Sequence, residues 1–203
     1  MGVAWLRRWP RPQRSAEDIR LPFLRLMPTV AVRMKRLTRS DILAALNALS
    51  EELGTQSGRH EVLIAGGAAM VLLYGARDST KDVDAVFSSS AVRDAASRVA
   101  TRMSLPLDWL NDGVKGYLHG RSLGNAVLDT PSLSVKTLAV EQLLAMKLSA
   151  WRDDVDISDA VLLLSKLEGG KTQIWRWVAR YLVPGRELKA QLSFDDLWEA
   201  REA

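Results

Sequence analysis

Cysteine is absent from this 203-residue chain, and histidine occurs only twice. The absence of cysteine excludes disulfides, zinc sites built on thiolates and cysteine nucleophiles, and it fits a reducing, cytoplasmic location. His60 and His119 are isolated from each other, so neither indicates a metal site or a general base built on histidine. No apolar run reaches the roughly 18 to 20 residues that span a bilayer, so we expect no membrane-spanning helix.

Basic residues are concentrated at the start of the chain. Residues 1–36 carry nine Lys or Arg and two Asp or Glu, a net charge of +7, whereas residues 37–203 carry a net charge of −3. A basic arm of this kind binds phosphates by releasing counterions. Residues 1–33 also contain four prolines and no sustained hydrophobic period, which is typical of a disordered extension or of a start codon assigned too early. Because Met34 directly precedes the first regular helical pattern, we expect translation to begin there.

Hydrophobic periodicity predicts an α/β (α+β) fold, with a mixed core over residues 34–136 and a helical part over residues 137–203. Helices are expected at residues 42–53, 68–74, 89–103, 140–151, 158–167, 172–183 and 194–202. Strands are expected at residues 61–65, 82–87, 116–119, 125–128 and 133–135. Residues 56–60 are expected to form a polar loop.

Gly66 and Gly67 lie where the first predicted strand turns into a helix. Without side chains, they let backbone N–H groups approach an anion at the positive end of the helix dipole. Any tight strand-to-helix turn also favours glycine, so the pair alone is a weak indication of a phosphate site. In the loop that follows, donors for the phosphates of a nucleoside triphosphate (NTP) are offered by Arg77, Thr80 and Lys81. An exposed polar loop is the alternative interpretation of these three residues.

Asp82 and Asp84 stand two residues apart in the predicted strand 82–87, so both carboxylates project from one face. Two neighbouring carboxylates repel each other unless a cation lies between them. Mg²⁺ prefers such hard oxygen ligands together with substrate phosphates. An isolated Asp-x-Asp pair more often belongs to a solvated strand face. Here the pair follows the glycine turn by one short helix and a loop, and that combination indicates a metal and phosphate site more strongly than either part alone.

These motifs resemble those of the polymerase-β-type nucleotidyltransferase superfamily, in which a Gly-Gly or Gly-Ser turn precedes Asp-x-Asp on a strand. More narrowly, the chain is similar to the nucleotidyltransferase toxins of bacterial toxin–antitoxin systems, the AbiEii-like and MenT-type group. This resemblance covers about residues 38–168. It rests on residues 65–67, 80–84, 108–115, 141–147 and 152–157.

The resemblance implies a polymerase-β-like core that transfers a nucleotide from an NTP to a hydroxyl, with two Mg²⁺ ions at Asp82 and Asp84. In such toxins a lysine on a later helix, and an aspartate shortly after it, join the metal-binding pair. The matching positions here are Lys147 and Asp156, with Asp153 as the alternative acid. The resemblance further implies that the acceptor is the 3′ end of tRNA, that translation is blocked, and that a cognate antitoxin is a partner.

Alternatives remain open at this point. Lys147 lies on an otherwise apolar helix face, so its ammonium either reaches water or enters a site. The aspartates between residues 153 and 159 are also typical of the first turn of a helix. Because residues 37–203 are net negative, the acceptor could instead be a protein or a small molecule. A catalytically inactive nucleotide-binding regulatory module is a further alternative, which the intact Asp-x-Asp pair disfavours.

Overall fold

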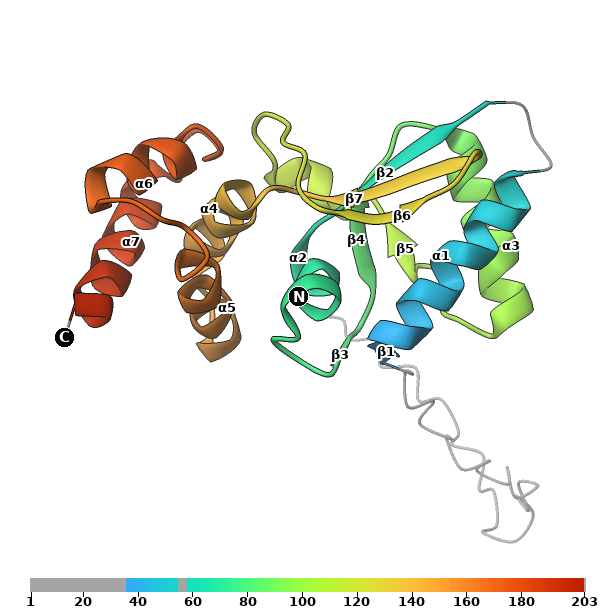
Figure 1. The fold of residues 1–203 in the computed structure, drawn as a ribbon, viewed down its shortest axis with the longest axis horizontal. Helices are drawn as coiled ribbons and strands as arrows, with labels where there is room; N and C mark the ends of the chain where they lie inside the picture. Colours follow the sequence, from blue (N-terminus) through green and yellow to red (C-terminus); the bar gives the residue numbers. More distant parts are fainter. Residues whose placement is uncertain (1–35, 55–57, 203) are drawn as a thin grey trace, which may run out of the picture. The chain divides into compact units, whose positions relative to one another are not determined.

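The centre of the structure is a mixed five-stranded sheet with the strand order β5-β4-β2-β7-β6 (Figure 1). The computed structural model describes residues 36–54 and 58–202. The predicted basic extension over residues 1–33, and residues 56 and 57 of the predicted polar loop, lie outside these ranges. The strands are β2 (His60–Ile64), β4 (Val83–Val86), β5 (Leu110–Asn111), β6 (Ala126–Asp129) and β7 (Leu133–Thr137). The expected mixed sheet is therefore confirmed.

The register of the sheet brings the end of β2 next to the middle of β4. Strand β2 runs antiparallel to β4, with Ile64 opposite Ala85, and parallel to β7. Ala65, directly after β2, donates its N–H to the carbonyl oxygen of Asp84 at 2.8 Å. On its other side β4 runs parallel to β5, with Asp84 opposite Asn111. The glycine turn and Asp84 are thus neighbours because of strand pairing.

Two long helices, α1 (Arg39–Leu53) and α3 (Ser90–Met103), pack against each other beside the sheet (Figure 1). Helix α1 begins before the predicted residue 42 because Thr38 and Asp41 form a capping box. The Thr38 hydroxyl accepts the N–H of Asp41 at 3.2 Å, and the Asp41 carboxylate accepts the N–H of Thr38 at 3.0 Å. Thr38 also belongs to the short strand β1 (Leu37–Thr38), which pairs with β3 (Ser79–Thr80) and so positions the loop before Asp82.

The glycine turn is itself the start of a helix. Helix α2 (Gly66–Ala69) continues directly into the π-helical segment η1 (Met70–Tyr74), where the sequence predicts a single helix over residues 68–74. Met70, Val71 and Leu72 are buried in the core, and the segment ends at Gly75. This short buried helix holds Gly66 and Gly67 firmly against the sheet.

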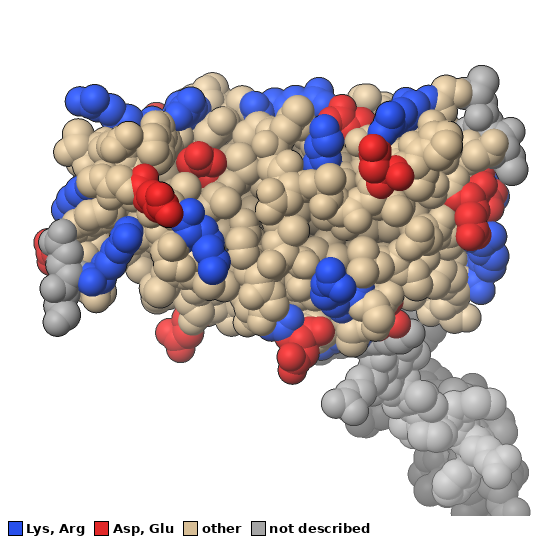
Figure 2. Space-filling model, in the orientation of Figure 1, with Lys and Arg blue, Asp and Glu red and all other residues tan. Residues whose placement is uncertain are grey.

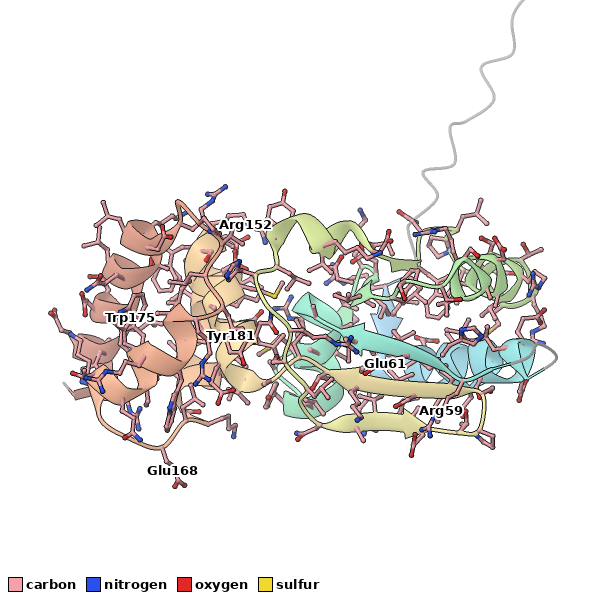
Figure 3. The ribbon with its side chains drawn as sticks, turned by 90° about the horizontal axis from the view of Figure 1, so that it is seen from above. Arg59, Glu61, Arg152, Glu168, Trp175 and Tyr181 are labelled. Carbon is pink, nitrogen blue, oxygen red and sulfur yellow. The ribbon has the colours of Figure 1, made fainter. Side chains whose placement is uncertain are left out.

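The C-terminal part contains the helices α4 (Val140–Ala150), α5 (Asp154–Leu164), α6 (Lys171–Ala179) and α7 (Glu187–Glu202). Helix α4 packs against the other three. Helix α5 begins earlier than the predicted residue 158 because the Asp153 side chain accepts the N–H of Asp156 at 3.0 Å and caps the helix. Trp175 on α6 packs against Phe194 on α7, with ring centroids 5.3 Å apart (Figure 3).

The strand predicted at residues 116–119 is wrong. Residues Gly113–Tyr117 form a 3-10 helix, η2, in whose first turn Lys115 donates its N–H to the carbonyl of Asp112 at 3.1 Å. Gly113 and Gly116 in η2 have little strand propensity, and the short alternating pattern of residues 116–119 does not compensate for it. None of the helices within the described ranges has the length and apolarity needed to cross a membrane.

Candidate active site

Strand β4 presents Asp84 on one face and apolar side chains on the other. Val83 and Ala85 are fully buried, and Asp84 between them is partly exposed, which confirms the predicted alternation. Asp82 lies immediately before β4. Its carboxylate accepts a 3.4 Å hydrogen bond from the side-chain amide of Asn111 on the neighbouring strand β5. The sequence indicates no role for Asn111, whereas strand pairing places it beside Asp82 and Asp84.

The carboxyl group of Asp82 lies in an environment that disfavours its negative charge. Burial raises the pKa of Asp82 above its ordinary value, and the neighbouring charge of Asp84 raises it further. The ammonium of Lys81 acts in the opposite direction. A cation at this position would relieve the repulsion between the two carboxylates.

Close approach explains both glycines of the turn. Gly66 has a left-handed φ of +55°, and a Cβ atom there would lie 2.9 Å from Oδ2 of Asp84. A Cβ atom on Gly67 would lie 2.7 Å from the hydroxyl oxygen of Thr80. The backbone of this turn therefore touches Asp84 and Thr80 so closely that no larger residue fits without a shift.

A cavity of about 740 Å³ gathers most of the predicted site residues. From the core, it is lined by Gly66, Gly67, Arg77, Thr80 and Asp84. From the helical part, it is lined by Lys147, Asp156 and the alternative acid Asp153. Lys81 and Asp82 stand beside the cavity and do not line it. The two groups of predicted site residues, more than 60 positions apart in the chain, therefore line the same cavity.

A buried ion-pair network joins the two halves. The ammonium of Lys147 lies 2.8 Å from Asp156 and 2.7 Å from Asp159, and Arg77 forms an ion pair with the same Asp159. Both aspartates are buried. Asp159 is a member of the site that the sequence did not single out. Its position one helical turn after Asp156 places both acids on one face of α5, and that spacing is the signal that could have identified it.

Asp156 is held as a carboxylate by its partners. Burial alone would raise the pKa of Asp156, but hydrogen bonds and charges from Arg152 and Lys147 outweigh it and lower the pKa to about 2. Arg152 donates from Nε to this carboxylate at 3.0 Å. Asp153, by contrast, is exposed and acts as the N-cap of α5. The two candidate acids therefore occupy different environments.

Asp82 and Asp84 suit the binding of Mg²⁺ as it occurs in enzymes that act on phosphates. Within residues 36–54 and 58–202, no cluster of three or more Asp, Glu or His side chains is arranged to hold a metal. Mg²⁺ is commonly bound by only one or two carboxylates, with substrate phosphates and waters as the other ligands. Asp82 and Asp84 supply that number of carboxylates, and Asp84 lines the cavity together with the glycine turn.

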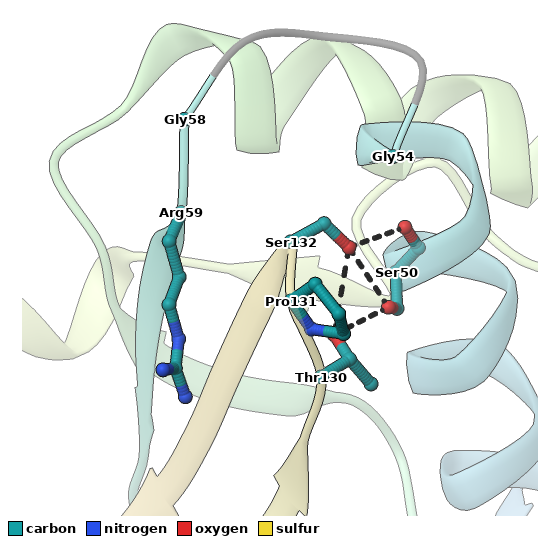
Figure 4. A pocket seen from close by; sticks show the side chains of 7 residues that line it. All are labelled: Ser50, Gly54, Gly58, Arg59, Thr130, Pro131 and Ser132. Carbon is teal, nitrogen blue, oxygen red and sulfur yellow. Dashed lines mark hydrogen bonds between the residues drawn. The ribbon is translucent and has the colours of Figure 1, made fainter.

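Another cavity, of about 570 Å³, offers no comparable chemistry (Figure 4). Its lining residues are Ser50, Gly54, Gly58, Arg59, Thr130, Pro131 and Ser132. The three hydroxyl groups hydrogen-bond to one another, with Ser50 lying 2.7 Å from Thr130 and 3.0 Å from Ser132. The Arg59 guanidinium forms an ion pair with Asp129. This cavity contains no carboxylate, so the acidic pair marks the first cavity as the candidate active site.

Comparison with known proteins agrees with this geometry. Residues 41–166 match the family described as nucleotidyltransferase of unknown function (DUF6036). No curated protein and no solved structure matches the chain. The family match spans more than half of the chain and contains the glycine turn, the acidic pair and the Lys147 network. This chain therefore belongs to that family of nucleotidyltransferases.

Proposed function

We propose that this protein transfers a nucleotide from an NTP to an acceptor hydroxyl, with Asp82 and Asp84 as the ligands of two Mg²⁺ ions in a polymerase-β-like core. The observation that carries the proposal is the contact between Gly66 and Asp84 at the wall of the cavity that also contains Lys147. A glycine turn, Asp84 and a lysine line this cavity, and Asp82 stands two residues from Asp84, which together give the set of groups that phosphate transfer requires.

The reaction is an in-line displacement at the α-phosphorus. The acceptor oxygen forms a bond to the α-phosphorus, the bond from that phosphorus to the bridging oxygen of the β-phosphate breaks, and pyrophosphate leaves with the bonding electrons. The proton of the acceptor hydroxyl passes to solvent or to a neighbouring base. When bound by the two carboxylates, Mg²⁺ supplies Lewis-acid stabilisation of the charge on the phosphate oxygens.

The chain's own groups bind and orient the triphosphate. The backbone N–H groups of the turn at Gly66 and Gly67 are the proposed phosphate donors, because neither residue carries a side chain that would keep an anion away. Arg77 and Thr80 line the same cavity and offer donors to the β- and γ-phosphates, and Lys81 contributes charge from beside it. Lys147 faces the space where negative charge grows in the transition state.

Asp156 is proposed to position Lys147. A carboxyl group with a pKa of about 2 is a weak base at neutral pH, and both of its oxygens already accept charged hydrogen bonds. Asp153 lines the cavity as well and is exposed, so it remains the alternative for direct assistance to the acceptor hydroxyl.

The acceptor is proposed to be the 3′ end of tRNA, with growth arrest as the consequence and a cognate antitoxin as the partner. The support is the likeness of residues 65–67, 80–84 and 141–147 to the toxin group. Expression from an inducible promoter is expected to arrest bacterial growth, and Asp82→Ala is expected to relieve it. An Asp82→Ala variant that arrests growth as strongly as the wild type would contradict the toxin role.

The direct test is incubation of the full chain with Mg²⁺, each α-³²P-labelled NTP and total bacterial tRNA. Asp82→Asn removes one metal ligand without a change of volume, and Asp94→Asn removes an exposed carboxylate on α3 as the matched control. We expect label on tRNA with the wild type and Asp94→Asn, and a loss of at least about 100-fold with Asp82→Asn.

Other outcomes identify the alternatives. Label on protein or on a small molecule would keep the transferase chemistry and change the acceptor. If no product is labelled, and Mg²⁺ with NTP does not raise the melting temperature, the protein is a module without nucleotidyltransferase activity, because a bound ligand must stabilise the folded state.

A further inference from the structure

The mouth of the active-site cavity carries exposed aromatic and basic side chains that the transfer chemistry does not use. They are Tyr117 at the end of η2, Arg152 just before α5, and Arg186 and Lys189 at the start of α7; together with the apolar Val155 on α5 we call them the rim patch. All five line the same cavity as Asp84 and Lys147. They lie at the opening of the site, where the acceptor must enter.

The rim patch offers both a flat apolar surface and positive charge. Tyr117 is 68% exposed and Val155 is 48% exposed. The Arg152 side chain is 73% exposed, although its Nε is held by Asp156. Figure 3 shows Arg152 at the edge of the C-terminal helices that faces η2. Tyr117 and Arg152 line the same cavity, so the phenol ring and the guanidinium face one space.

The other two cations are available for an anionic ligand. Within the described residues, neither Arg186 nor Lys189 forms an ion pair, and the ammonium of Lys189 is anchored by donation to the carbonyl of Ala150 at 2.6 Å. Asp153 lines the same opening, but its carboxylate accepts the N–H of Asp156. Over the face of the molecule drawn in Figure 2, basic and acidic side chains are interspersed.

We propose that the rim patch binds the terminal nucleotides of a single-stranded nucleic-acid acceptor, with a base on Tyr117 and Arg152 and backbone phosphates on Arg186 and Lys189. Successive bases stack on aromatic side chains and on guanidinium planes, and cations follow the backbone, so this combination is typical of single-strand binding. An acidic protein would use the cations without the exposed ring. The inference rests on the proposed function, and it names the residues that recognise the acceptor.

Arg186 and Lys189 lie beyond residues 41–166, the part of the chain that matches the family. Part of the proposed acceptor site therefore lies outside the segment that matches the family, whereas Tyr117, Arg152 and Val155 lie within it. Variants of α7 are expected to change acceptor binding and to leave nucleotide binding intact.

The test is binding of a fluorescein-labelled, 12-nucleotide single-stranded RNA to the full chain without NTP, followed by fluorescence anisotropy between 50 and 300 mM KCl. Arg186→Gln/Lys189→Gln removes two rim charges, and Lys166→Gln/Arg176→Gln removes two exposed charges that do not line the cavity. All variants keep the basic residues 1–36, so differences between them isolate the rim patch.

We expect the rim double variant to bind about tenfold more weakly than the control double variant at 100 mM salt. Its log–log salt slope is expected to be shallower by about 1.4, at roughly 0.7 per phosphate contact on a single strand. Tyr117→Ala is expected to weaken binding by about tenfold with an unchanged salt slope, and Tyr117→Phe to bind normally, because stacking needs only the ring.

Equal affinities and slopes for the rim and control double variants would overturn the proposal, as would a wild-type chain that does not bind the RNA. The thermal shift with Mg²⁺ and NTP, measured on the same samples, separates this failure from failure of the proposed transferase. A shift that persists in the rim variant leaves the nucleotide half of the site intact, and no shift in the wild type would count against the proposed function itself.

Discussion

Replacement of Gly66 by alanine is expected to disable the active site through Asp84, and Gly75 provides a matched control. The two glycines have nearly identical left-handed φ angles, +55° and +56°. An added Cβ at Gly66 would lie 2.9 Å from Oδ2 of Asp84, whereas at Gly75 it would meet no atom within 4 Å. Both variants therefore place an alanine at the same positive φ, and only Gly66→Ala displaces the proposed metal ligand.

The backbone penalty sets the expected loss of stability. An alanine in the left-handed region costs roughly 1 to 2 kcal/mol. For a chain of this length, each kcal/mol lowers the melting temperature by roughly 2 to 4 °C. Gly75→Ala is thus expected to melt about 2 to 8 °C lower than the wild type with unchanged activity per folded molecule. Gly66→Ala is expected to melt in a similar range or slightly lower, because Asp84 must also move.

The activity of the two variants separates the site effect from the backbone effect. A displacement of about 1 Å in a reacting constellation reduces the rate by roughly 100-fold. The assay is the initial rate of transfer of labelled nucleotide at saturating Mg²⁺, compared with thermal unfolding of the same preparations. If Gly66→Ala transfers nucleotide within about threefold of Gly75→Ala, the close contact with Asp84 has no catalytic importance and the reasoning fails.

Three further changes test the packing and the electrostatics. Because the pKa of Asp156 is lowered from 3.8 to about 2, its ion pairs contribute roughly 2 kcal/mol to the free energy of unfolding above pH 3.8. This contribution is lost as the pH falls through about 2. Urea unfolding should therefore show Asp156→Asn less stable by that amount at pH 7 and by clearly less below pH 3; a pH-independent difference would contradict it. Trp109 is fully buried and donates its indole N–H to the carbonyl of Ala96 at 3.0 Å, so Trp109→Phe is expected to cost roughly 2 to 3 kcal/mol in guanidinium unfolding. A Cβ on Gly124 would lie 2.4 Å from the carbonyl oxygen of Leu138, so Gly124→Ala is expected to lower the melting temperature by roughly 5 °C or more.

The sequence predicts the acidic strand and its glycine turn well because both are encoded locally. The alternation of β4 depends on Val83 and Ala85, whose burial needs only a period of two. Gly66 marks a position where the backbone comes close to another group, although the sequence does not say that this group is Asp84. Local chemistry therefore identifies the residues of the site, and strand register determines how they meet.

The contacts that complete the site are not local, which is why the sequence leaves them out. Arg77 and Asp159 are separated by 82 positions in the chain, and no periodic pattern links a loop residue to a helix so far away. Strand β5 contains only two residues, too few for an alternating pattern to indicate it. The aspartates at the start of α5 are ambiguous for a different reason, since Asp153 caps the helix while Asp156 is buried, and both roles favour the same residue type.

The charge balance inside the cavity limits how the proposed reaction can work. Lys147 and Arg77 line the cavity together with the glycine turn, and both are already paired with the buried carboxylates of Asp156 and Asp159. These pairs fix the geometry of the cavity wall, because removal of one partner would leave an uncompensated buried charge. They leave little net positive charge for a triphosphate, which carries several negative charges. Arg186 and Lys189 line the same cavity, but they belong to the rim patch that we assign to the acceptor. We therefore expect cations bound at Asp82 and Asp84 to supply the missing charge, so that NTP binding itself, and not only the transfer step, depends steeply on divalent metal.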